Sequence, residues 1–243
     1  MMLPGHVSCT VRPALTPSIT SARAMVAATG DFGLLTTTPM NRKAHWQVVY
    51  ETKESADVSW YQAEPRHVLE LVREMSTGPN TAIIDIGGGD STLVDHVVTE
   101  QLGHITVLDI SAAAFTRARV RLSGRAELAE WIEADISNVE LPRQSYDIWH
   151  DRAVFHFLTT VEERGRYVTT ATEAVRVGGR MIISTFAPNG PSRCSGLDVV
   201  RYSARDLANE FAPAFTLRSE LTAVHRTPSG AEQHFTIVVL ERQ

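Results

Sequence analysis

Three aspartates stand at or near the ends of three successive predicted strands, and this spacing is the first sign of chemistry in the sequence. Asp85 lies in the apolar run 82–86, and Asp109 and Asp135 each close a later run. The carboxyl ends of parallel strands meet at one edge of a sheet, where α/β proteins bind their ligands. Any one of these acids is also explained as a turn or loop residue. Three acids at or near the ends of three successive strands, taken together, predict a single binding crevice.

A glycine-rich turn, Gly87–Thr92, follows the first of these strands. Glycines let the backbone approach a ligand closely, and the next helix offers free amide groups and a positive dipole end. A dinucleotide fingerprint would place a third glycine at Thr92, and Asp90 would repel a pyrophosphate. The turn therefore favours a nucleotide-like ligand without phosphates over NAD, with Gly87 and Gly89 beside it.

Predicted strands and helices alternate along the chain. Apolar runs predict strands at 82–86, 105–109, 131–135, 146–150, 180–186, 215–225 and 233–241, and helices at 64–75, 93–102, 111–122, 160–175 and 203–211. This alternation indicates a doubly wound α/β fold with a mostly parallel sheet. The turn 227–230 is too short for a crossover helix, so the last two strands must be antiparallel. We expect a seven-stranded sheet with a terminal antiparallel strand.

Composition bounds the class of protein. The 243 residues carry 43% hydrophobic and 21% charged side chains, which suits one soluble α/β domain. A net charge of -5 gives no electrostatic footprint for nucleic acid, and no apolar run is long enough for a membrane span. Cys9 and Cys194 form no disulfide framework, and no Cys/His spacing resembles a metal site. We therefore expect a cytoplasmic protein with reduced cysteines and no metal.

The first 39 residues differ from the rest in composition. They are rich in Ser, Thr, Ala and Pro, and Arg12 and Arg23 are their only Arg or Lys residues. One interpretation is a transit-like leader, and the other is an upstream extension before a working protein that begins near Met40. The sparse basic residues favour the second. We expect a disordered extension at 1–39 and one domain at 40–243.

Four segments resemble the motifs of the class I, seven-stranded, Rossmann-like S-adenosylmethionine (SAM)-dependent methyltransferases. In order, they are Ile84–Ser91, Val107–Ser111, Glu133–Ile136 and Val177–Arg180, and the reversed terminal strand also matches. The resemblance covers about residues 42–242 and implies a methyltransferase with SAM as its cofactor.

The resemblance also implies a role for each of the three acids. Asp85 would hold the methionine amino group, Asp109 the ribose hydroxyls and Asp135 the adenine amino group, and Ile110 and Ile136 would flank the nucleoside. Trp60 and Tyr61 would close over the cofactor as a lid, the alternative being plain packing of an N-terminal helix.

The segment Trp149–Phe157 resembles an uncharacterised bacterial group within the class, as do the aromatic segments around Trp46 and Trp60 and the segment 186–196. Its Asp-Arg-Ala-Val stretch is also faintly similar to a motif of small lysine methyltransferases. The Asn/Asp-Pro-Pro-Tyr motif of adenine and glutamine methyltransferases is absent after the fourth strand, which argues against those substrates.

Two sets of side chains are candidates for the reaction itself. His150 and Asp151 end the fourth strand, where a base or an orienting acid would stand, although a hydrogen-bonded strand-end histidine is an equal alternative. His156, Arg193 and Cys194 are candidates for acceptor binding, although a packed histidine and an inert thiol are the simpler explanations for the first and last.

These residues predict methyl transfer to a small-molecule acceptor by in-line displacement. Protein lysine N-methylation is the nearest alternative, an NAD-dependent oxidoreductase is a more distant one, and a SAM-binding module without catalysis is a non-enzymatic one. We expect no nucleic-acid or membrane partner, and the sequence does not predict an oligomeric state.

Overall fold

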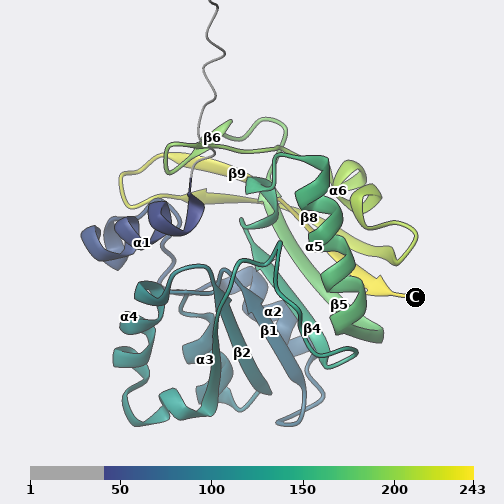
Figure 1. Ribbon diagram of the computed structural model, residues 1–243, viewed down its shortest axis with the longest axis horizontal. Helices are drawn as coiled ribbons and strands as arrows, with labels where there is room; N and C mark the ends of the chain where they lie inside the picture. Colours follow the sequence, from purple (N-terminus) through teal and green to yellow (C-terminus); the bar gives the residue numbers. More distant parts are fainter. Residues whose placement is uncertain (1–40) are drawn as a thin grey trace, which may run out of the picture. The chain divides into compact units, whose positions relative to one another are not determined.

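A computed structural model describes residues 41–243. The expectations for the 1–39 extension, including Cys9, lie outside the described residues. Figure 1 shows the sheet and the helices that surround it.

The described chain forms a seven-stranded sheet in the order β3-β2-β1-β4-β5-β9-β8. Strands β1 to β5 are mutually parallel, and β9 runs antiparallel to both of its neighbours, β5 and β8. The predicted fold, mostly parallel with a reversed strand in the terminal pair, is therefore confirmed. The strands are β1 Ala82–Ile86, β2 His104–Asp109, β3 Ala129–Glu133, β4 Tyr146–Arg152, β5 Val175–Phe186, β8 Phe215–Arg226 and β9 Glu232–Arg242.

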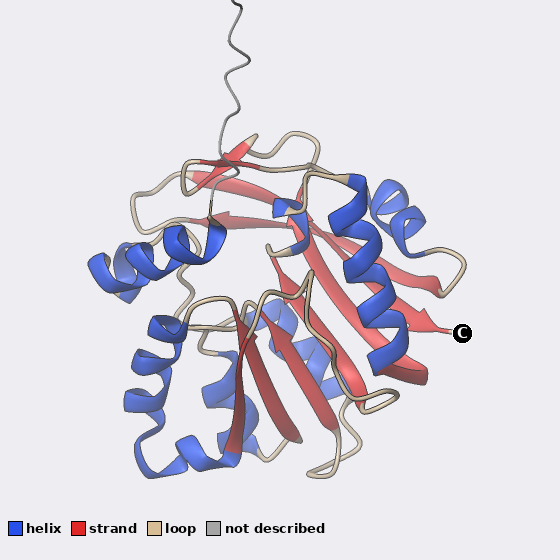
Figure 2. Ribbon diagram, viewed as in Figure 1, coloured by secondary structure: helices blue, strands red, loops and turns tan. Residues whose placement is uncertain are grey.

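Helices cover both faces of the sheet (Figure 2). Buried side chains of α2, α3 and α4, such as Leu69, Val97 and Phe115, form one core layer, while those of α5 and α6, such as Tyr167 and Phe211, form the other. The longer helices are α1 Arg42–Thr52, α2 Arg66–Met75, α3 Leu93–Glu100, α4 Ala112–Leu122, α5 Val161–Ala174 and α6 Ala204–Phe211. Short 3-10 turns lie at η1 Ser55–Asp57, η2 Ser123–Leu128 and η3 Phe155–Phe157. No helix in the part of the chain that the structure describes is long and apolar enough to cross a membrane.

Local sequence signals fix the start of α5 as predicted. Thr160 accepts a hydrogen bond from the backbone N–H of Glu163 at 3.2 Å, and the Glu163 carboxylate accepts from the Thr160 backbone at 3.3 Å. This reciprocal capping box satisfies two amide groups that the helix itself cannot pair.

The structure corrects three sequence predictions. The third strand ends at Glu133, so Asp135 lies in the following turn rather than closing the strand. The fifth strand, predicted at 180–186, already begins at Val175, directly after α5 ends at Ala174. Helix α1 and the small hairpin of β6 (Arg193–Cys194) and β7 (Leu197–Asp198) were not predicted, because neither has a sustained apolar period.

Candidate active site

Two adjoining cavities open at the carboxyl ends of the central strands. The first has an empty volume of about 790 Å³ and the second about 670 Å³, part of each open to solvent. We call the two together the crevice, and they share five lining residues, Tyr50, Trp60, Ile86, Gly87 and Arg152.

Asp109, the last residue of β2, lines the first cavity and is 4% exposed. Its Oδ1 accepts a hydrogen bond from the Ser111 backbone at 2.9 Å. Burial, with a smaller contribution from the charge of Asp85, raises the pKa of Asp109 to about 7. A buried carboxylate with spare acceptor capacity is suited to binding a pair of hydroxyl groups.

The glycines make room beside this carboxylate. A Cβ on Gly89 would lie 2.6 Å from Asp109 Oδ2, and one on Gly87 would lie 2.1 Å from Val154 Cγ2. Both residues have positive φ values, 26° and 66° respectively, which a side chain would strain. Gly87 lines both cavities, whereas Gly89 lies behind Asp109 and lines neither.

The turn after β3 supplies the far end of the first cavity. Asp135 lines it, and its Oδ1 accepts from the Ser137 backbone at 2.9 Å and from the Ser137 hydroxyl at 2.7 Å. Ile110 and Ile136 line the same cavity, and Ile136 is 4% exposed. The arrangement is an apolar slot with one carboxylate at its edge, which can take a planar base.

Asp85 and His150 form a buried pair in the second cavity. They lie opposite each other on β1 and β4, with Asp85 Oδ1 2.7 Å from His150 Nδ1. Within residues 41–243, Asp85 Oδ2 and His150 Nε2 have no hydrogen-bond partner. When Nδ1 donates to the carboxylate, Nε2 is left as a proton acceptor. The pair can therefore hold a cationic group at Oδ2 and take a proton at Nε2.

Four aromatic side chains wall the first cavity, and we call them the aromatic roof. Trp46 packs edge-on against Trp60 at 5.6 Å and Phe157 at 5.3 Å between ring centroids, and Tyr50 lies 6.3 Å from Trp60. Trp60 lines both cavities and Tyr61 lines the second. Trp46, Tyr50 and Phe157 are further lining residues, to which the sequence analysis assigned no role in the site. The spacing of Trp46 and Tyr50, four residues apart, is helical and was the available signal.

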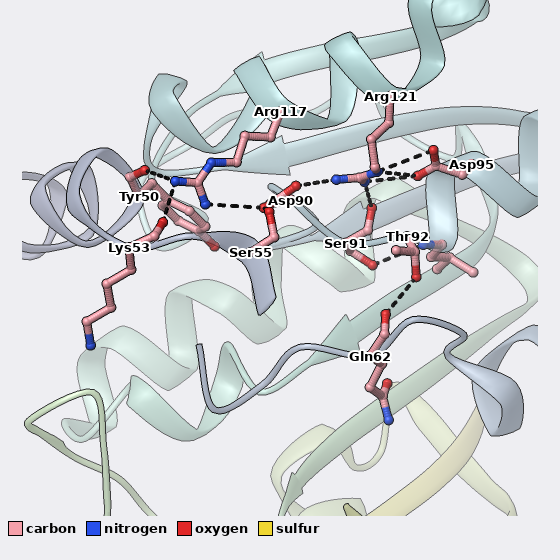
Figure 3. Close-up of polar contacts among 11 residues, drawn as sticks. Tyr50, Lys53, Ser55, Gln62, Asp90, Ser91, Thr92, Asp95, Arg117 and Arg121 are labelled. Atoms are coloured by element: carbon pink, nitrogen blue, oxygen red, sulfur yellow. Dashed lines mark hydrogen bonds and ion pairs between the residues drawn. The ribbon is translucent and has the colours of Figure 1, made fainter. Parts of the chain in front are cut away.

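Arginines of α4 tie the segment that carries the roof to the glycine turn (Figure 3). Arg117 donates to the carbonyl oxygens of Tyr50, at 3.1 Å, and of Lys53. Asp90 lies between Arg117 and Arg121 as an ion-pair partner of both, and it accepts a hydrogen bond from Ser55. The negative charge of Asp90 is therefore offset by two arginines.

Asp151 does not line the crevice. Side chains alternate along a strand, so Asp151 points to the face opposite His150. It is fully buried and accepts hydrogen bonds from Tyr167 Oη at 2.6 Å and from the Val154 and Phe155 backbones at 2.8 and 3.0 Å. Burial is the main cause that raises the pKa of Asp151 to about 6. The observed contacts organise the turn after β4.

The three residues predicted for acceptor binding lie in different places. His156 is fully buried outside the crevice and accepts from the Phe186 backbone at 3.4 Å, and burial followed by the charge of Arg152 lowers the pKa of His156 to about 3. Arg193 is exposed in the β6–β7 hairpin and pairs with Asp198 at 3.0 Å. Cys194 lines the first cavity, and burial raises the pKa of its thiol.

No group of His, Cys, Asp and Glu within residues 41–243 has the geometry of a metal site. The residues of the crevice do fit SAM. Gly87 lines both cavities without a side chain, Asp109 retains acceptor capacity, and Asp85 Oδ2 is a buried acceptor without a partner among the described residues, in the lining of the second cavity.

Comparisons with known proteins agree with this geometry. Residues 83–179 match the family model described as a methyltransferase domain. A SAM-dependent methyltransferase of Anabaena variabilis has a TM-score of 0.66 at 17% identity, over 84% of this chain and 96% of that chain. The 1,6-didemethyltoxoflavin-N1-methyltransferase of Burkholderia thailandensis, solved with S-adenosylhomocysteine, has a TM-score of 0.61 at 16% identity, over 83% of this chain and 84% of that one.

A third structure, from work on the conversion of a disulfide bond into a thioacetal group in echinomycin biosynthesis, has a TM-score of 0.69 at 19% identity, over 83% of this chain and 92% of that chain. No curated protein matches the sequence at a significant level. At these identities the structures establish the shared fold, and the family match over residues 83–179 indicates a methyltransferase domain. They give no support to an NAD-dependent oxidoreductase. Residues 83–179 therefore match a methyltransferase domain, and the chain shares its fold with SAM-dependent methyltransferases.

Proposed function

We propose that this enzyme transfers the methyl group of SAM to a small-molecule acceptor by in-line displacement. The observation that carries the proposal is the aromatic roof, which supplies walls of the crevice from within the chain. Trp46 and Trp60 line the first cavity together with Asp109 and Asp135, where a protein acceptor would need an open surface. A site walled by aromatic side chains in this way suits a molecule small enough to enter whole.

The proposed cofactor site uses one carboxylate from β1, one from β2 and one from the turn after β3. Asp109 would accept the two ribose hydroxyls, and Asp135 would accept from the adenine amino group, with the base between Ile110 and Ile136. Asp85 Oδ2 would hold the methionine amino group. Support comes from the burial of Asp109 and Asp85 and from the first cavity, which contains the other three residues.

When bound, SAM supplies a methyl group on a sulfonium centre, which is already a good leaving group. The chain must align the acceptor with that centre and exclude water. The aromatic roof would exclude water, because its four rings line the first cavity. Gly87, between the two cavities, would let the backbone approach the reacting centre.

His150 is the proposed general base, for an acceptor that arrives protonated. Asp85 Oδ1 would fix the Nδ1–H tautomer, which leaves His150 Nε2 free to take the proton of the nucleophile. Asp151 has no place in this proposal, because its carboxylate is fully used by Tyr167 and the turn after β4.

Protein lysine N-methylation is the rival function. Its sequence support is the Asp-Arg-Ala-Val stretch, in which the aspartate would orient a substrate amine. Asp151 is buried on the opposite face of β4 from His150, so this stretch does not offer a carboxylate to the crevice. The structure therefore lends the lysine hypothesis less support than the small-molecule one.

The test is a labelling experiment with a whole-cell lysate divided by ultrafiltration. The full chain is incubated with methyl-labelled SAM and each fraction, and Asp109→Ala serves as the cofactor-site control. We expect label in the low-molecular-weight fraction and a strong reduction with the control variant. Label confined to a protein band would overturn the small-molecule proposal.

A further inference from the structure

A third cavity adjoins the crevice on the side of α2. It has an empty volume of about 620 Å³ and lies between the start of α2 and strands β5, β8 and β9. It shares Gln62, Pro65 and Arg152 with the second cavity, and Arg152 lines all three cavities. The third cavity therefore meets the crevice at Arg152.

The guanidinium of Arg152 lacks a carboxylate partner among residues 41–243. Its Nη1 donates to the Trp60 carbonyl oxygen at 2.8 Å, and its plane lies over the ring of Phe235 at 5.5 Å. Its Nη2 is shielded from solvent and has no hydrogen-bond partner in this part of the chain. Burial lowers the pKa of Arg152 to about 10, which still leaves the group charged at neutral pH. A charge held in this way is costly unless a ligand pairs with it.

Ser184 provides a second unsatisfied group beside Arg152. The two residues are opposite partners in the β4–β5 ladder, so their side chains project from the same face of the sheet. Ser184 is 1% exposed, lines the third cavity, and has an Oγ without a partner in the described chain. A guanidinium N–H and a hydroxyl side by side form a donor pair that matches a carboxylate.

The other basic side chains that line the third cavity already have an ion-pair or hydrogen-bond partner. Arg66 pairs with Glu64 at 3.3 Å, and Arg226 pairs with Glu232 at 2.7 Å. His225 Nε2 donates to the Ser59 carbonyl oxygen at 2.8 Å. The unmatched positive charge of this cavity is therefore concentrated at Arg152.

We propose that the methyl acceptor is a small molecule with a carboxylate, which Arg152 and Ser184 bind at the junction of the crevice and the third cavity. This inference rests on the proposed function and names its substrate class. His150 and Arg152 are alternate residues of β4 and share a face, about 7 Å apart along the strand. The carboxylate therefore anchors the acceptor at Arg152 and does not itself react. The nucleophile is a separate atom of the acceptor, a few bonds away and beside His150.

The test measures the binding of simple probes to the full chain saturated with S-adenosylhomocysteine. Acetate and benzoate are the carboxylate probes, and acetamide and benzamide are the matched neutral ones. We expect at least one carboxylate to bind about tenfold or more tightly than its amide. In Arg152→Gln, we expect the affinities for the carboxylate and for its amide to differ by no more than about twofold. Arg152→Lys should restore part of the preference for the carboxylate.

Arg125→Gln is the matched control, because Arg125 is exposed, donates to Thr99 and lines none of the three cavities. It should leave the preference intact. The proposal is overturned by the absence of any carboxylate preference in the native chain, or by a preference that survives Arg152→Gln.

A cofactor role for Arg152 has its own signature. If Arg152→Gln weakens S-adenosylhomocysteine more than tenfold but spares methylthioadenosine, which lacks the carboxylate, then Arg152 binds the cofactor and the inference is wrong. Failure of the carboxylate proposal can be distinguished from failure of the proposed function. The latter would appear as label confined to a protein band in the lysate experiment.

Discussion

Asp85 Oδ1 lies 2.7 Å from His150 Nδ1, across neighbouring strands and with both side chains at most 3% exposed. This pair leaves His150 Nε2 as the proton acceptor in the second cavity. We therefore predict that His150→Ala lowers kcat by roughly 100- to 10,000-fold for an acceptor that must lose a proton. S-adenosylhomocysteine affinity, measured by calorimetry, should change by less than about fivefold.

His96→Ala is the control for this prediction, because His96 lies on α3 away from the crevice and contacts Glu100. It should leave kcat unchanged. A merely structural role for His150 would instead lower cofactor affinity and the unfolding midpoint together, with kcat spared.

Asp109 should dominate cofactor affinity. Asp109→Ala removes a charge-assisted contact to the ribose, worth about 1.5–3 kcal/mol, so S-adenosylhomocysteine affinity should fall roughly 10- to 100-fold in calorimetry. Because the ionised form of this group is the better acceptor, affinity of the native protein should also weaken as the pH falls below about 7. Unchanged affinity in the variant would remove Asp109 from the site.

The same group should make the free protein less stable at higher pH. Burial raises the pKa of Asp109 from 3.8 to about 7, so the folded chain holds this proton more tightly than the unfolded chain does. Stability from this group is therefore lost as the pH rises from about 4 to 7. Asp151, whose pKa is raised to about 6, acts in the same direction.

Urea unfolding of the free protein at several pH values measures this effect. Asp109→Asn should flatten the decline in unfolding free energy between pH 4 and 7, whereas Asp198→Asn, at an exposed position, should not. An equal slope in Asp109→Asn and the native chain would contradict the raised pKa.

Asp151 should matter for folding more than for catalysis. Asp151→Ala leaves the Tyr167 hydroxyl and two backbone N–H groups without their acceptor in the core. Each such loss costs about 1–3 kcal/mol, so the unfolding free energy should fall by roughly 3 kcal/mol or more in urea titration. A variant with native stability but no activity would instead make Asp151 catalytic.

The sheet and most of its strand ends could be predicted because their signals are local. Alternating apolar runs defined the strands, and the pair Thr160 and Glu163 marked the start of α5. The residues at the carboxyl ends of the strands, such as Asp85 and Asp109, followed from the rule for ligand sites in parallel sheets.

Trp60 was predicted as part of a lid, but the rest of the roof and the acceptor side could not be predicted in the same way, because they depend on contacts between distant segments. Arg152 meets Trp60, 92 residues earlier in the chain, and Phe235 in β9. Asp151 was misplaced for another reason. The sequence indicated that it ends a strand, but the face it occupies follows only from the register of β4 against β1.

The most direct test of the account is a crystal structure of the full chain with S-adenosylhomocysteine. We predict the ribose hydroxyls on Asp109, the adenine between Ile110 and Ile136, and the sulfur at the His150 end of the crevice, nearer to His150 Nε2 than to Asp135. A ligand bound outside the crevice, or one whose sulfur lies at the Asp135 end, would contradict the account.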